Sequence, residues 1–191
     1  FNFSCFISRF LIPCFFTTLF NEQFVINKKV IIRQTKVFMN KDFIHIYNSL
    51  IKLTTNKNLY IDIKSQDQFS DRITLFLIHF AFFLKNFKSI QNKKILQEIY
   101  DFNFRQIELS IREIGYGDQS INKKMKDYIN FFHKIITDIH LWDELEKSEK
   151  LKRFSELLFN FNKLDKLVVY FDKFNKDLSK KTLNSYIKSV I

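Results

Sequence analysis

Turn-forming residues are so scarce in this chain that they restrict its fold more than any other feature. The 191 residues include two glycines, Gly115 and Gly117, and one proline, Pro13. A sandwich or barrel of short strands needs many tight turns, which glycine and proline largely supply. We therefore expect an all-α protein, a single-domain multi-helix bundle, with the glycine pair at one connection that needs backbone freedom.

The first 38 residues differ from the rest of the chain. Both cysteines, Cys5 and Cys14, and Pro13 precede Met39, the first methionine. The cysteine spacing is not typical of a zinc or redox motif. Composition therefore distinguishes residues 1–38 from residues 39–191, which we call the body of the chain.

Three alternatives remain for residues 1–38. A transmembrane helix needs about 20 apolar residues in a row, and Arg9 interrupts the run. An acid-poor leader with scattered basic residues could be a targeting peptide. We favour the third, translated upstream sequence or a disordered extension. Residues 1–38 are thus expected to be a non-native leader and residues 39–191 one helical domain.

Apolar residues recur at helical spacing through the body. Helices are predicted from Met39 to about 54–58, and at 70–84, 92–114, 118–142, 151–162, 164–178 and 183–191. The stretch 73–84 is apolar on every face, which indicates a core or membrane helix. Its twelve residues span about 18 Å, less than the roughly 30 Å of a bilayer core. We predict a central, fully apolar core helix and no transmembrane segment.

Local signals mark the connection at the glycine pair. Gly115 lies where a helix end favours a left-handed residue. Asp118 or Ser120 could cap the helix that follows. The pair is expected to form a turn between antiparallel helices, since the acidic Asp118 disfavours a phosphate-binding loop.

The body offers no recognisable catalytic constellation. His133 and His140 share a helix face, but no third ligand lies at metal spacing. His79 lies within the apolar helix and is expected to be a buried, neutral imidazole. His45 has no motif around it. No nucleophile elbow or phosphate-binding glycine loop is present in the sequence. We predict no enzyme activity, no metal and no cofactor.

The chain is basic, with 31 Lys and Arg against 20 Asp and Glu. Basic charge with many aromatics raises the possibility of nucleic-acid binding. The lysines, however, occur as doublets, and most phenylalanines occupy helical core positions, whereas stacking on bases needs exposed aromatics. Solvated helix faces are favoured. The alternative is a basic helical RNA- or ribosome-binding module that uses Lys123, Lys124 and Lys126.

A longer motif surrounds the glycine pair. Residues 111–126 read Ile-Arg-Glu-Ile-Gly-Tyr-Gly-Asp-Gln-Ser-Ile-Asn-Lys-Lys-Met-Lys. This segment resembles the stretch L-R-E-x-G-V-G-D-x-x-V-x-K-x-M-K of the ubiquinol-cytochrome c chaperone family. The matching positions are Arg112, Glu113, Gly115, Gly117, Asp118, Lys123, Lys124, Met125 and Lys126. A second block resembles the same family through Tyr47, Asp67, Asp71, Arg72 and His79. Ile73 and Tyr116 depart from the family pattern.

The resemblance implies an all-α assembly factor for respiratory complex III. Its expected client is newly made cytochrome b, bound in an apolar groove, together with a small partner subunit. The location implied is the bacterial cytoplasm at the inner membrane, or the mitochondrial matrix and inner membrane, with possible ribosome contact. The motif residues are expected to be architectural or interface residues. Gly115 and Gly117 would set the turn, Asp118 would cap a helix, and Arg72 would pair with Asp67 or Asp118.

Overall fold

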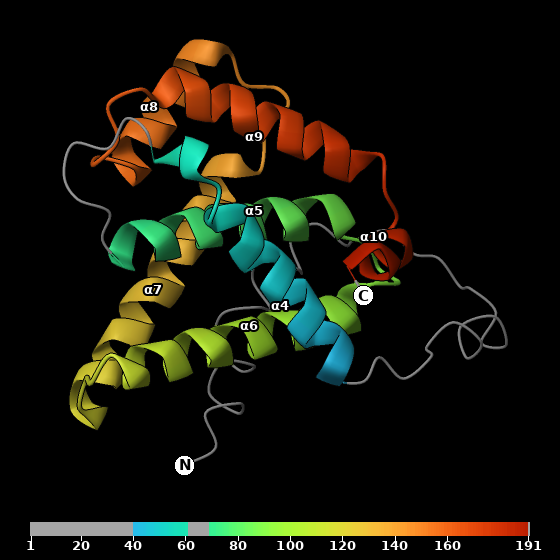
Figure 1. Cartoon of the computed structure of the whole chain (residues 1–191). Coiled ribbons are helices and arrows are strands. Elements are labelled where there is room, and N and C mark those ends of the chain that lie inside the picture. The colour runs from blue at the N-terminus through green and yellow to red at the C-terminus, as the bar shows by residue number, and fades with distance from the viewer. Residues whose placement is uncertain (1–39, 61–68, 191) are drawn as a thin grey trace, which may run out of the picture. The chain divides into compact units, whose positions relative to one another are not determined.

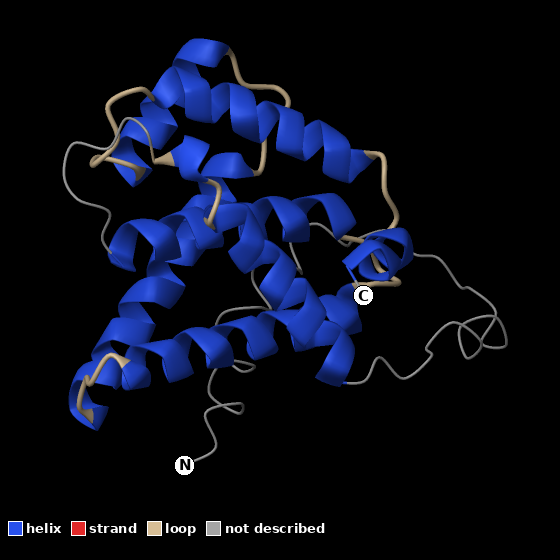
Figure 2. Ribbon diagram, viewed as in Figure 1, coloured by secondary structure: helices blue, strands red, loops and turns tan. Residues whose placement is uncertain are grey.

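The computed structural model describes residues 40–60 and 69–190, all within the unit Met39–Ile191. The elements are α4 (Asn40–Thr54), η1 (Lys57–Leu59), α5 (Phe69–Phe87), α6 (Lys93–Glu113), α7 (Asp118–Ile139), α8 (Lys147–Leu157), α9 (Leu164–Ser179) and α10 (Leu183–Val190). No strand occurs among these residues (Figure 2). The all-α prediction is confirmed. The predictions for residues 1–38 and for Asp67 lie outside the described residues.

Helix α5 forms the centre of this unit. It packs against α4, α7 and α9, and Figure 1 shows α6 on one side of it and α9 on the other. Every residue from Leu75 to Phe83 is buried, because this run has almost no polar side chain to place in water. A fully apolar helix is not confirmed, however, since Asp71 and His79 are buried in it as well.

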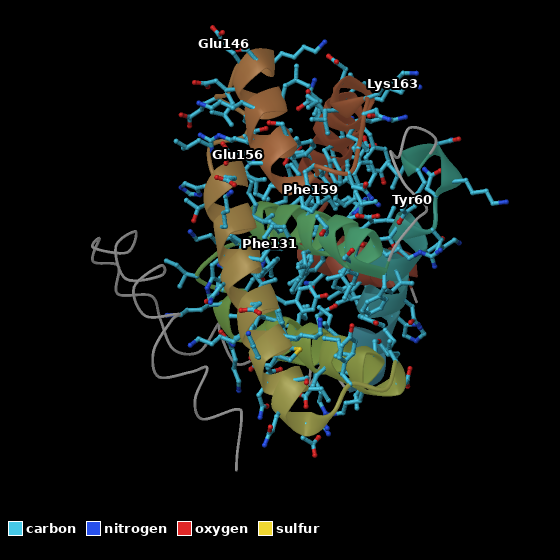
Figure 3. All side chains as sticks on the ribbon, turned by 90° about the vertical axis from the view of Figure 1, so that its left-hand side faces the viewer. Tyr60, Phe131, Glu146, Glu156, Phe159 and Lys163 are labelled. Atoms are coloured by element: carbon cyan, nitrogen blue, oxygen red, sulfur yellow. The ribbon has the colours of Figure 1, made fainter. Side chains whose placement is uncertain are left out.

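Aromatic rings connect α5 to the helices on both sides. Toward α7, the Phe80 ring stacks on Phe132 with centroids 5.2 Å apart. Toward α9, the Phe82 ring stacks on Phe171 at 5.5 Å. Burying one such side chain contributes about 1.5–3 kcal/mol, and favourable ring geometry adds about 0.5–1.5 kcal/mol. Figure 3 shows side chains filling the space between the helices, with Glu156 at the outside.

The corner between α7 and α8 ties α9 to this core. Trp142 Nε1–H donates to Asp172 Oδ1 at 2.7 Å, and Asn175 Nδ2–H donates to Asp143 Oδ1 at 2.5 Å. Lys85 of α5 also forms an ion pair with Asp143. Burial opposes the charge on Asp143, but the hydrogen bonds and charges of its partners outweigh burial and lower its pKa. Polar contacts thus connect the α7–α8 corner to both α5 and α9.

Two predicted boundaries differ from the structure. Helix α7 ends at Ile139, so the turn that follows carries Trp142. Helix α8 runs from Lys147 to Leu157, although the predicted range was 151–162. Its first turn is exposed to solvent and therefore lacks an apolar period. The chain then turns, because Phe161 N–H bonds to Leu158 O at 3.0 Å and both side chains are buried.

Candidate functional site

The turn between α6 and α7 contains the glycine pair and most of the motif. Gly115 has φ +96°, the left-handed region that favours glycine, and it directly follows the C-cap residue Ile114. Its N–H bonds to Arg112 O at 2.9 Å. The predicted left-handed residue at this helix end is confirmed.

Gly117 and Asp118 have different roles from those expected. Gly117 has φ −72° and ψ 156°, an extended conformation open to any residue, and it is the N-cap of α7. Asp118 is instead the first residue of the helix. Its carboxylate accepts a hydrogen bond from Arg112 Nη1 at 2.5 Å. A carboxylate in the first turn also interacts favourably with the helix dipole.

We expect alanine substitutions to separate the two glycines. Gly115→Ala should lower the free energy of unfolding by about 1–2 kcal/mol, because an L side chain in a left-handed conformation is strained. Gly117→Ala should change it by less than about 0.5 kcal/mol or stabilise slightly, since a Cβ there meets nothing within 4 Å. Urea denaturation of both variants measures the difference. Equal losses would contradict the assigned backbone roles.

Arg112 connects both sides of the turn. Its Nη2 and Nε donate to Glu108 Oε1 at 2.7 and 3.1 Å, in addition to the bond with Asp118. The hydrogen bonds that Arg112 donates, first to Glu108 and then to Asp118, raise its pKa. All three side chains are exposed or half-buried, so these pairs contribute little to stability. They link the end of α6 to the first residue of α7 across the turn.

Large apolar side chains lie exposed around this turn. Ile114 is 51% exposed, Tyr116 42% and Leu109, one turn earlier on α6, 43%. All residues from 112 to 120 are exposed. Lys124 Nζ lies 4.3 Å from the Tyr116 ring centroid, a cation–π contact. Three exposed apolar side chains thus lie on or near the turn.

The lysines and methionine of the motif fall on different faces of α7. Lys123 and Lys126 are exposed, and Lys124 is half-buried beside Tyr116. Met125 is buried, 3% exposed, so it anchors α7 on the core. The three lysines border the turn without forming one uniform patch.

Tyr47 brings the first helix to the same region. Its side chain lies near those of Ser110 and Glu113, and both affect its pKa. Burial raises the pKa of Tyr47, the hydrogen bond with Ser110 lowers it, and the Glu113 charge raises it. The structure therefore brings Tyr47 of the second block close to the motif around the glycines. The partner residues Glu108 and Ser110 were not identified from the sequence.

The remaining residues of the second block lie elsewhere. Asp71 is buried and accepts a hydrogen bond from Asn160 Nδ2 at 2.8 Å. Arg72 is exposed. Two carboxylates were expected as partners of Arg72. Of these, Asp118 bonds to Arg112, and Asp67 lies outside the described residues. The bond between Asp71 and Asn160 connects the start of α5 to the segment between α8 and α9.

His79 is a structural residue of the core. It donates from Nδ1–H to Leu75 O at 2.7 Å, and its Nε2 accepts a hydrogen bond from the Tyr170 hydroxyl at 2.9 Å. The rings of Phe171 and Phe174 also contact it. Burial lowers the pKa of His79 to about 4, so the imidazole is neutral at ordinary pH. The prediction of a buried, neutral histidine agrees with this geometry.

Two further features of the described helices bear on the site. No group of three or more His, Cys, Asp or Glu within residues 40–60 and 69–190 could hold a metal ion. Nor does this part contain a helix with the length and apolar character needed to cross a membrane.

The model of one known protein family matches the middle of the chain. Residues 62–153 match the model of the family described as Ubiquinol-cytochrome C chaperone. A search of curated proteins and a search of solved structures found no match. The matched region contains α5, α6 and α7, and with them the whole turn described above.

Proposed function

We propose, from the premise that residues 62–153 belong to the ubiquinol-cytochrome C chaperone family, that this protein is a non-enzymatic assembly chaperone acting on newly made cytochrome b. The family supports the coarser statement, a chaperone role in assembly of ubiquinol-cytochrome c reductase, respiratory complex III. The match over residues 62–153 is the observation that carries the proposal.

We propose the α6–α7 turn as the border of the apolar groove that holds the client. Ile114, Tyr116 and Leu109 give this surface its apolar character. Single exposed apolar residues are common, but here three occur within eight residues of the chain. Buried aromatic and aliphatic anchors carry most of the affinity in protein recognition. A hydrophobic segment of cytochrome b offers the matching chemistry.

The geometry of the turn supports such a contact. Arg112 already bonds to residues on both sides of the turn, Glu108 and Asp118, before any client binds. Rigid binding surfaces lose less entropy on association. Gly117 has open space where a Cβ would stand, so a partner can approach its backbone closely. Rigidity and access together favour recognition over a purely architectural role.

The partner and the location follow from the family in the same way. We propose that a small second chaperone subunit acts with this protein. We also propose that both act at the inner membrane of a bacterium or of a mitochondrion, where cytochrome b is made and inserted.

The test uses the tagged full chain in cells that make complex III. Replacing Ile114 and Tyr116 together by serine should reduce the cytochrome b that co-purifies by about tenfold or more, because hot-spot truncations each cost more than about 1 kcal/mol. Ile90→Ser with Leu141→Ser is the matched control, since Ile90 and Leu141 are also exposed. It should retain the client.

Thermal melting of both double variants separates binding from folding. The melting temperature is expected to change little, because all four residues are at least 42% exposed and none belongs to the buried core. Equal retention of cytochrome b by both variants would reject the α6–α7 turn as the client surface. If cytochrome b is lost only when RNA is removed from the preparation, the RNA-binding alternative is favoured instead.

A further inference from the structure

The outward face of α9 carries a row of lysines. The exposed residues Lys166, Val169, Lys173, Lys176 and Lys180 follow one another at spacings of three and four, which places them on one side of the helix. The opposite side, with Leu167, Val168, Phe171, Asn175 and Leu178, is buried. We call the first set the α9 lysine face.

Each of the three acidic residues of α9 is paired. Asp165 pairs with Lys147 at 3.0 Å, and Asp172 accepts hydrogen bonds from Trp142 and Lys150 of the α7–α8 region. Asp177 pairs with Lys180 of the face, whose Nζ lies 3.7 Å from its carboxylate. The four exposed lysines outnumber the two exposed acids, Asp165 and Asp177, so this side of the helix has a net positive charge.

Other helices distribute their exposed charges differently. On α6, Arg112 is paired with Glu108 one turn earlier. On α7, Lys134 is paired with Glu156 of α8, and the exposed Lys126 is followed by the exposed Asp127. Mixed charges of this kind are typical of ordinary solvated faces. The α9 lysine face differs in the size of its positive excess, since it carries four lysines and only one exposed acid, Asp177, lies between them in the sequence.

The form of the α9 lysine face favours a bilayer over a nucleic acid. Helix α9 lies on the outer side of the described helices (Figure 1), and Lys163 at its start projects at the edge in Figure 3. Its 16 residues extend about 24 Å as a straight ridge. Binding to single strands needs exposed aromatics, but Phe171 and Phe174 are turned toward His79. Val169, 62% exposed, lies among lysines whose stems are themselves apolar.

We propose that the α9 lysine face docks the protein on the surface of a bilayer containing anionic phospholipids. Lysines near such a surface are attracted by its negative potential, and each contributes about fivefold to partitioning. The face lies outside residues 62–153, so it adds a surface that the family assignment does not describe. Neither cytochrome b nor complex III is needed for this contact.

The experiment is flotation of the full chain with vesicles of phosphatidylcholine alone or with about one third phosphatidylglycerol. Wild type should bind only the anionic vesicles, and less at high salt. Lys173→Gln, Lys176→Gln and Lys180→Gln combined should lower the partition coefficient by about 100-fold. The matched control combines Lys94→Gln, Lys123→Gln and Lys126→Gln, three exposed lysines elsewhere. It removes the same charge and should lower partitioning by less than about fivefold.

Three outcomes would overturn the proposal. Wild type could fail to bind anionic vesicles, both triple variants could lose binding equally, or the α9 variant could lose RNA binding while vesicle binding stays unchanged. Circular dichroism of each variant confirms that it is folded. Since the vesicles contain no protein, failure here leaves the chaperone assignment untouched, and loss of cytochrome b capture leaves the vesicle result untouched.

Discussion

Replacement of Trp142 by alanine is expected to lower the free energy of unfolding by about 3–5 kcal/mol. The side chain is 0% exposed, and its ring centroid lies 5.3 Å from that of Phe82 and 4.8 Å from that of Phe154. Alanine would leave a cavity where α5, α8 and α9 meet, and would remove one donor to Asp172. Urea denaturation followed by circular dichroism measures the loss.

Trp142→Phe is the matched control for that substitution. It keeps an aromatic ring in the core but removes the indole N–H, so a smaller loss of about 1–2 kcal/mol is expected. Lys150 remains as a donor to Asp172 at 2.9 Å. A loss below about 1 kcal/mol for the alanine variant would show that this corner does not hold α9 on the core.

Acid is expected to destabilise the protein through His79. The unfolded chain takes up a proton on this residue near pH 6.5, whereas burial lowers the pKa of His79 in the folded state to about 4. As pH falls from about 6.5 to 4, only the unfolded state gains the proton. The free energy of unfolding should therefore fall by about 2 kcal/mol between about pH 7 and 5, and by about 3 kcal/mol in all.

His79→Gln tests this assignment, because glutamine fills similar space and does not titrate. The variant should lose stability at neutral pH, since its contacts with Leu75 and Tyr170 are altered, but its stability should depend less on pH. His133→Gln is the comparison: burial lowers the pKa of His133 too, but this side chain is only half-buried. A pH dependence identical in wild type and His79→Gln would rule out the proposed cause.

Apolar periodicity was sufficient to predict the helical class and most helices. Helices α4, α6, α7 and α9 each have one buried face, so their apolar residues recur at helical spacing. The position of Gly115 was predictable for a similar reason, because a helix end with a left-handed residue has a local signal. These features depend on near neighbours in the chain.

Contacts between residues far apart in the sequence were harder to predict. The apolar pattern of α9 does not tell that Asn175 faces Asp143, or that Asp172 accepts a hydrogen bond from Trp142, because these partners lie some 30 residues away. The sequence left residues 143–150 open as a connection or a solvated helix end, because a solvated first turn has no apolar period, and α8 begins within them at Lys147. Asp118 was expected as a cap, but Gly117 can adopt the extended N-cap conformation one residue earlier.

The candidate site was only partly predictable in the same sense. The resemblance identified Arg112, Glu113 and Asp118 as a group, but it did not indicate that Arg112 bonds to Asp118. Nor did the sequence indicate that Tyr47 lies near Ser110, or that His79 forms a hydrogen bond with Tyr170 inside the core. Three-dimensional contacts therefore separate the motif into a surface group at the α6–α7 turn and an internal group on α5.

The central claim is that this protein supports assembly of complex III, and the most direct measurement is the amount of assembled complex in cells that lack it. Deleting the gene should reduce ubiquinol-cytochrome c reductase and its cytochrome b severely, and re-expression of the wild-type chain should restore both. The Ile114→Ser, Tyr116→Ser variant should restore little, whereas the Ile90→Ser, Leu141→Ser control should restore fully. Normal levels of the assembled complex in the deletion strain would contradict the account.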